Sequence, residues 1–211
     1  MTEAEAQQGR AAAETTAEKL IAAALALAEE RGWRAVSLAD VAKRAAVPLS
    51  DCYRLIPDKA ALLCRLLAAT DEHMLRHGAA DPHDNTRDRL FDVMMRRFDA
   101  LQSRRQGMIA ILRDLPFDPG SALRLLPRLR RSVVWMLEAA GISTAGLRGA
   151  VRVRVLGGVY LCGLRAWIDD ETADMARTMA TLDKALRRVE RLADMLPRRA
   201  GRRDQDEPVA A

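Results

Sequence analysis

The histidines are the first residues whose type and spacing could support chemistry. His73 and His77 stand four residues apart, which places both imidazoles on one face of a helix and suits two ligands of one metal ion. Asp71 and His83 are near in sequence, but no third ligand at a defined spacing is evident. Solvent-facing histidines at a polar helix end are the better interpretation, and we expect no metal site.

A catalytic site would need a nucleophile with a base, carboxylates placed for acid–base work, or a loop that cradles a phosphate. The sequence shows none of these patterns. Asp169, Asp170 and Glu171 are adjacent, but their position after Trp167 predicts a turn between helices that contains a helix N-cap. We therefore expect a protein that is not an enzyme and needs no cofactor.

The composition favours an all-α protein. Among 211 residues, 49% are hydrophobic and 4% are aromatic, and β-branched runs are few. Cys52, Cys64 and Cys162 have no spacing typical of a disulfide framework or a zinc cluster, which suits a cytoplasmic protein. No stretch approaches the ~20 apolar residues of a membrane span, so we expect no integral membrane association.

The net charge of +5 suits a nucleic-acid partner only if the basic residues gather where that partner would bind. Between Glu14 and Leu62, seven basic residues are balanced by seven acidic residues. The surplus lies mostly further along the chain. Charge alone therefore does not identify a DNA-binding surface.

Turn and linker signals divide the chain into four sections. Residues 1–14 and 197–211 are polar or mixed in charge, and we expect both to be disordered. Residues 15–62 have the pattern of a small helical domain. Residues 63–196 continue as a larger helical domain, which brings the expected total to about nine helices.

The small domain contains two short helices around a tight turn. The first begins after Ser37, which forms a capping box with Asp40, and it ends before Pro48. The second lies between Pro48 and Pro57. With a longer helix on each side, this arrangement is typical of a helix-turn-helix, whose second helix enters the major groove.

The segment VSLADVAKRAAVPLSDCYRLIPDKAALL resembles the TetR family of regulators. The resemblance covers roughly residues 16–75, and beyond them only the number and length of the helices match. It rests on Val36, Asp40, Val41, Ala42, Ala45, Val47, Tyr53, Pro57, Lys59, Ala61 and Leu62. It implies a dimeric regulator, and most simply a repressor, that binds a palindromic operator and is released by a small ligand.

The resemblance also implies which side chains contact DNA. Leu49, Ser50 and Arg54 fall at positions that face the groove. Tyr53 and Lys59 fall at positions that contact phosphates, and Lys59 lies near a helix N-terminus, which itself attracts a phosphate. The full predicted DNA-binding set is Ser37, Lys43, Leu49, Ser50, Tyr53, Arg54 and Lys59.

The turn and the second short helix depart from the family pattern. Ala46 stands where the family usually has glycine, and Pro48, Leu49 and Asp51 replace a small polar residue, a basic residue and threonine. A carboxylate at Asp51 is repelled by phosphates, although acidic side chains can accept a hydrogen bond from cytosine N4. These positions make retained DNA binding the property to test.

Two stripes of residues predict a dimer interface. The last helix has a heptad-like apolar stripe, which is typical of a helix that packs against another helix. The helix before it carries Gly158, Cys162 and Ala166 at intervals of four, and such small residues allow close helix approach. Packing inside the monomer is the alternative. The TetR resemblance favours the dimer, so the predicted interface comprises Gly158, Cys162, Met175, Met179, Leu182, Leu186 and Val189.

Methionine and aromatic residues of the large domain predict a site for an apolar or aromatic ligand. Methionine adapts to irregular shapes, and aromatic side chains supply flat apolar walls. An ordinary core is the alternative, because apolar stripes at helical spacing are usually core. The predicted lining is Met94, Phe98, Met108, Leu112, Trp135, Met136, Tyr160 and Trp167.

A second resemblance defines the alternative function. The segments RDRLFDVMMRRFDAL and RSVVWMLEAAGI are similar to bacterial relatives of the lipid-binding accessory protein of ubiquinone biosynthesis. That protein has the TetR fold but is not a repressor. The alternative is therefore a lipid-binding accessory protein that does not bind DNA.

Overall fold

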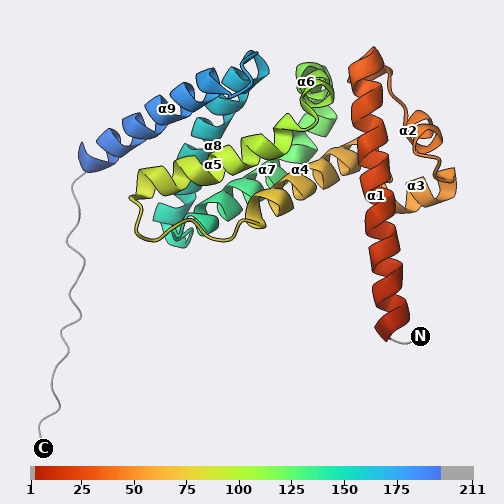
Figure 1. The fold of residues 1–211 in the computed structure, drawn as a ribbon, viewed down its shortest axis with the longest axis horizontal. Helices are drawn as coiled ribbons and strands as arrows, with labels where there is room; N and C mark the ends of the chain where they lie inside the picture. Colours follow the sequence, from red (N-terminus) through yellow and green to blue (C-terminus); the bar gives the residue numbers. More distant parts are fainter. Residues whose placement is uncertain (1–2, 196–211) are drawn as a thin grey trace, which may run out of the picture.

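In the computed structural model, which describes residues 3–195, the chain forms nine α-helices and two short 3₁₀ segments (Figure 1). The prediction of an all-α protein with about nine helices is confirmed for this part of the chain. The α-helices are α1 (Glu3–Arg31), α2 (Leu38–Arg44), α3 (Leu49–Leu55), α4 (Lys59–Leu75), α5 (Thr86–Gln102), α6 (Arg105–Asp114), α7 (Pro119–Ala139), α8 (Gly146–Ile168) and α9 (Ala176–Met195).

The long first helix corrects one prediction. α1 begins at Glu3, so the expectation of disorder over residues 1–14 is wrong where the structure describes them. This segment is rich in alanine, glutamate and glutamine, which are good helix formers, and it leads without a break into the buried part of α1. The tail predicted to be disordered, residues 197–211, lies outside the described residues.

α4 joins the small domain to the large one. Its N-cap is Asp58, whose side chain accepts a hydrogen bond from the Ala61 amide at 2.7 Å. The helix then runs unbroken to Leu75, packing against α1 and, further along, against α5 and α7. The predicted boundary between residues 62 and 63 therefore falls inside a continuous helix, which gives the two domains one shared rigid element.

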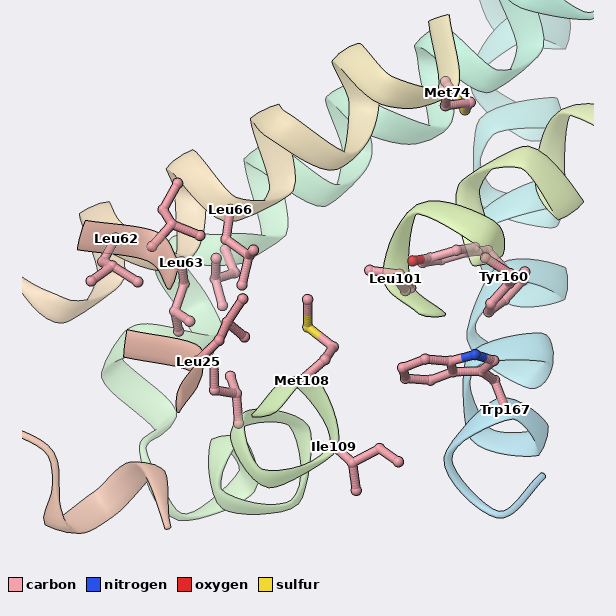
Figure 2. Packing of buried hydrophobic residues seen from close by; sticks show 14 of the residues in the cluster. Leu25, Leu62, Leu63, Leu66, Met74, Leu101, Met108, Ile109, Tyr160 and Trp167 are labelled. Atoms are coloured by element: carbon pink, nitrogen blue, oxygen red, sulfur yellow. The ribbon is translucent and has the colours of Figure 1, made fainter. Parts of the chain in front are cut away.

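The helices are arranged with α2 and α3 at one end of the molecule and α8 and α9 at the other (Figure 1). One continuous apolar core runs between these ends. Figure 2 shows Leu25 and Leu62 at one side of this core, Tyr160 and Trp167 at the other, and Met108 of α6 between them. In residues 3–195 no helix is both long enough and apolar enough to cross a membrane.

Candidate functional site

α2 and the turn after it have the local geometry of a helix-turn-helix. The Ser37 hydroxyl accepts a hydrogen bond from the Asp40 amide, and the Asp40 carboxylate accepts one from the Ser37 amide, both at 3.1 Å. This is the capping box predicted from the sequence. In the turn, Ala46 has φ 53°, the left-handed conformation that glycine adopts without strain. Alanine in place of glycine at position 46 therefore strains the backbone of the turn.

α3 has one buried face and one exposed face. Cys52 and Ile56 are buried against the rest of the domain. Leu49 is 58% exposed and Tyr53 is 71% exposed, although both are large and partly apolar. The outward face thus brings together four of the predicted DNA-binding residues: Leu49, Ser50, Tyr53 and Arg54.

The charges around this face are held in local pairs. Within α3, Arg54 forms an ion pair with Asp51, one turn earlier. Arg44 at the end of α2 pairs with Glu30 of α1. Lys43 is exposed and takes part in no ion pair among residues 3–195. Arg44 and Arg54 are therefore compensated locally, whereas Lys43 near the end of α2 is an exposed cation that is unpaired in this part of the chain.

Lys59 lies differently from the predicted phosphate contact. Its ammonium donates to the carbonyls of Trp33 at 2.7 Å and Val36 at 3.0 Å, and it lies 4.3 Å from the Trp33 ring centroid. Burial lowers the pKa of Lys59, while Asp118 and Asp114 act in the opposite direction. The side chain ties the start of α4 to the segment between α1 and α2, and its contact with a phosphate stays a prediction.

Most of the residues predicted to line a ligand site lie together in the bundle core. Phe98 is the centre of this group, with its ring centroid 5.6 Å from that of Tyr160 and 6.4 Å from that of Trp167. The Trp167 indole N–H donates to the Gln102 side chain at 2.9 Å. Met94, Met108, Leu112 and Met136 are buried or half-buried in the same continuous apolar core.

Trp135 is the exception and corrects the predicted lining. Its side chain is 42% exposed, whereas its neighbour Met136 is fully buried. Successive residues of an α-helix are about 100° apart, and the buried face of α7 includes Met136 and Leu137 but ends before Trp135. Trp135 therefore belongs to the outer surface of α7.

The bundle core also holds a cluster of charges that the sequence argument missed. Asp71 of α4 accepts hydrogen bonds from Arg97 of α5, from Arg128 Nη2 of α7 at 3.0 Å and from the Ser132 hydroxyl at 2.8 Å. Arg97 and Ser132 are fully buried, and Asp71 is 3% exposed. Arg97 falls on the same helical stripe as the buried residues Met94, Phe98 and Leu101, so its spacing alone signals a buried position.

The predicted dimer seam on α9 is corrected by its burial. Leu182 and Leu186 are 0% and 3% exposed, and Met175 is 6% exposed. α9 packs on α8 and α5 of the same chain, and a Cβ on Gly163 of α8 would lie 2.6 Å from Leu182 Cδ2. The seam therefore packs within the monomer, with Met179 and Val189 half-buried beside it.

The outward face of α8 has the opposite character. Gly158 and Cys162, the two α8 residues predicted for a dimer, are both exposed. They lie on a surface with Val151 at 56% exposure and Leu161 at 51%. Apolar side chains exposed along one helix in this way are typical of a surface that another molecule covers. We call this surface the α8 face: Leu147, Val151, Val155, Gly158, Leu161 and Cys162.

α6 contacts the small domain at two points. A Cβ on Gly107 would lie 2.4 Å from the Leu25 carbonyl oxygen of α1, so the backbones of α6 and α1 touch. At the end of α6, the Asp114 carboxylate accepts a hydrogen bond at 2.9 Å from the Arg34 amide, just after α1. α6 therefore packs directly against the segment that leads into the helix-turn-helix.

The other end of α6 contacts the aromatic group of the core. Arg105, its first residue, donates to the carbonyls of Trp167 at 2.8 Å and Asp170 at 2.5 Å, at the end of α8. Its guanidinium carbon lies 5.3 Å from the Trp167 ring centroid. One short helix thus connects the predicted ligand-lining residues to α1.

Comparison with known proteins agrees with this geometry. Residues 20–66, which run from the second half of α1 to the middle of α4, match the family model "Bacterial regulatory proteins, tetR family". The chain is 28% identical over 151 residues, 71% of each protein, to the HTH-type transcriptional repressor KstR of Rhodococcus jostii (strain RHA1). These matches support a transcriptional regulator of the TetR type.

Solved structures of TetR-family regulators share the fold beyond the matched segment. The regulator from Nitrosomonas europaea ATCC 19718 aligns with a TM-score of 0.66 and 24% identity, over 82% of this chain and 97% of its own. A regulator from Rhodococcus sp. RHA1 aligns with a TM-score of 0.60 and 19% identity, over 83% and 96%. The family consists of regulators, which agrees with the expectation that this chain is not an enzyme and favours a regulator over the lipid-binding accessory protein.

Proposed function

We propose that this TetR-family regulator is a ligand-controlled repressor. As a homodimer it binds a palindromic DNA operator, and it leaves the operator when a small apolar or aromatic ligand binds in the helical bundle. The observation that carries the proposal is the exposed face of α3, where Leu49, Ser50, Tyr53 and Arg54 stand clear of the core on the second helix of a helix-turn-helix.

Each residue of this face has a role suited to its chemistry. Leu49 and Ser50 lie at the N-terminus of α3, the part of a recognition helix that contacts base edges, and an apolar side chain there suits a thymine methyl group. Arg54 suits guanine, and Tyr53 can donate to a phosphate. Ion pairing with Arg54 compensates the charge of Asp51 before DNA binds.

The remaining predicted contacts support this face from its edge. Lys43 supplies a cation for a DNA phosphate. Ser37 is exposed at the N-terminus of α2 and supplies a polar contact to the DNA backbone. Lys59 acts indirectly by fixing the segment around Trp33 and Val36.

The α8 face is the proposed dimer interface. It combines exposed apolar side chains with Gly158 and Cys162, small residues that allow two helices to approach closely. A two-fold axis through this face would place two α3 helices on one side of a DNA duplex, as palindromic half-sites require. The buried seam of α9 supports α8 from behind.

Ligand control acts through α6 in this proposal. A ligand that displaces Trp167 or its neighbours would shift the carbonyls that Arg105 binds and, through Gly107, move α1. The ligand weakens DNA binding only if it prefers the dimer whose α3 helices no longer match the half-site spacing. Because the backbones of α6 and α1 touch, a ligand that displaces α6 also displaces α1 and, with it, α3.

Selection from a pool of random duplexes at low salt tests DNA binding. The wild-type protein should enrich a palindrome whose half-site centres lie about one helical turn, or a multiple of one, apart. Lys43→Ala should weaken binding to all sequences alike, and Arg188→Ala on the exposed surface of α9 is the matched control that should change nothing. No enriched sequence would overturn the repressor proposal.

Sedimentation tests the dimer separately. Val151→Arg and Leu161→Arg should convert a dimer to a monomer at micromolar concentration, because each places a charge in the proposed interface. Leu123→Arg is the control, since Leu123 is 68% exposed on α7, outside the α8 face. A stable wild-type monomer, or a dimer unchanged by both substitutions, would contradict this interface.

A further inference from the structure

The charge cluster in the bundle core has more positive than negative charge. The Asp71 carboxylate is paired with two guanidinium groups, those of Arg97 and Arg128. Arginine stays protonated in proteins, so the cluster carries one uncompensated positive charge. Neither arginine pairs with another carboxylate in the part of the chain that the structure describes.

The guanidinium of Arg97 also has unused donors. The side chain is 0% exposed; the Tyr160 side chain interacts with its guanidinium, but Nε and Nη2 have no well-formed hydrogen bond among residues 3–195. These two nitrogens lie on the same edge of the guanidinium, so their N–H groups form the fork that binds a carboxylate through two parallel hydrogen bonds. Leaving such donors buried and unpaired is costly, which points to a group that pairs with them in another state of the protein.

The wall around the cluster is deformable. Each helix that contributes to the cluster has a buried methionine one turn from its cluster residue: Met74 after Asp71 on α4, Met94 before Arg97 on α5, and Met136 after Ser132 on α7. Methionine is unbranched and repacks at low cost. On the fourth side, the Tyr160 ring lies with its centroid 5.2 Å from the Arg97 guanidinium carbon, extending from α8 towards α5 (Figure 2).

We propose that Arg97 recognises an anionic group on the effector, and that the effector is an apolar or aromatic molecule carrying one carboxylate. The carboxylate binds Nε and Nη2 of Arg97, and the apolar part lies between the methionines and the rings of Phe98 and Tyr160. This inference rests on the proposed function in one respect, because it takes the bundle core as the effector site. It adds the charge that the effector must carry.

Isothermal titration of the purified full-length protein, without DNA, tests the inference with two matched pairs of probes. These are dodecanoate with methyl dodecanoate, and 1-naphthylacetate with its methyl ester. For at least one pair, the acid should bind about 10- to 100-fold more tightly than its ester, as expected for charge-assisted hydrogen bonds at a buried site. Equal affinities within both pairs, or no binding by either acid, would overturn the inference.

Variants identify the residue responsible. Arg97→Gln should remove the preference for the acid while leaving ester affinity within about threefold, because Asp71 keeps its contacts with Arg128 and Ser132. Arg97→Lys keeps the charge but loses the fork, and should retain part of the preference. The control is Arg96→Gln on the same helix, since Arg96 pairs with Asp92 away from the cluster. A full acid preference in Arg97→Gln would overturn the inference even if binding itself is strong.

The outcome is distinguishable from failure of the proposed function. If esters bind as well as acids and still release the selected DNA, ligand control stands and the carboxylate inference fails. If acids bind preferentially through Arg97 but DNA affinity is unchanged, the inference stands and ligand control fails.

Discussion

The exposed face of α3 and the bundle core each contain an arginine–aspartate pair, and the pairs differ in their surroundings. On α3, the exposed fractions of the Arg54 and Asp51 side chains are 74% and 37%. In the bundle, those of Arg97 and Asp71 are 0% and 4%. An exposed pair contributes only about 0–1 kcal/mol and exchanges partners easily, whereas a buried charge that loses its partner costs several kcal/mol.

The difference matches the proposed roles of the α3 face and the bundle core. A surface that meets DNA needs side chains that can leave one partner for a phosphate or a base, and α3 provides them. A site that detects one small molecule needs a charge held in a fixed place, and the bundle provides Arg97. The following predictions test this contrast, from the largest expected effect to the smallest.

Removing the buried carboxylate should have the largest effect on stability. Asp71→Ala leaves two guanidiniums without their shared partner and should lower the free energy of unfolding by about 3–5 kcal/mol. Urea denaturation measures this change. Asp92→Ala is the matched control, because Asp92 pairs with Arg96 on α5 at 46% exposure and should cost less than about 1 kcal/mol. Equal losses in the two variants would contradict the contrast.

Asp170 tests a buried carboxylate that depends on hydrogen bonds instead of an ion pair. Burial raises its pKa, but four hydrogen bonds from Thr172 and Thr178 outweigh burial and lower the pKa to about 2, from a usual 3.8. A lowered pKa stabilises the fold above pH 3.8, and this contribution is lost as the pH falls towards 2.

Asp170→Asn should therefore lower the free energy of unfolding by about 2 kcal/mol at pH 7, with a smaller loss below pH 3.8. Denaturation curves of the wild type and the variant across this pH range measure the difference. A difference that stays constant from pH 7 to pH 2 would show that Asp170 does not act through its charge.

The strained turn before α3 should respond to glycine. Ala46→Gly relieves a left-handed alanine and should raise the free energy of unfolding by about 0.5–1 kcal/mol. Ala39→Gly on the exposed surface of α2 is the control and should lower it by a similar amount, because it adds glycine to a regular helix. Thermal denaturation measures the stability of both variants. A loss of stability in Ala46→Gly would contradict the inference that Ala46 is strained.

The exposed pair on α3 should give the smallest effect. Asp51→Thr removes a negative charge from the DNA-facing surface and releases Arg54, so affinity for the selected duplex should rise about two- to fivefold with stability within about 0.5 kcal/mol of the wild type. Fluorescence anisotropy measures the affinity. Asp99→Thr, an exposed carboxylate on α5, should leave it unchanged. Weaker binding by Asp51→Thr would mean that the carboxylate itself contacts DNA.

The starts of α2, α4 and α5 could be predicted from the sequence because the capping signals that set them are local, whereas the start of α1 could not. Ser37 and Asp40 cap α2, Asp58 caps α4, and Asn85 caps α5, each through a bond to a residue three positions away. The helix-turn-helix follows from these signals together with the family resemblance.

The outcomes that could not be predicted depend on what covers each apolar stripe. Periodicity assigns Leu182 and Leu186 to an apolar face, but it does not say whether α8 of the same chain or a partner covers that face. Trp135 and Met136 are similarly apolar, and only the packing of α7 places one outside and the other inside. Arg97 was missed because a charged residue within an apolar stripe is normally assigned to the surface.

The most direct test of the account is a side-by-side comparison of base preferences for the wild type and Arg54→Ala, from the same random duplex pool. If α3 reads base edges, the variant should retain the palindrome but lose its preference at one position of each half-site, with about 1–3 kcal/mol of discrimination removed there. A preference profile that is unchanged in shape, or uniformly weaker at every position, would contradict the assignment of α3 as the recognition helix.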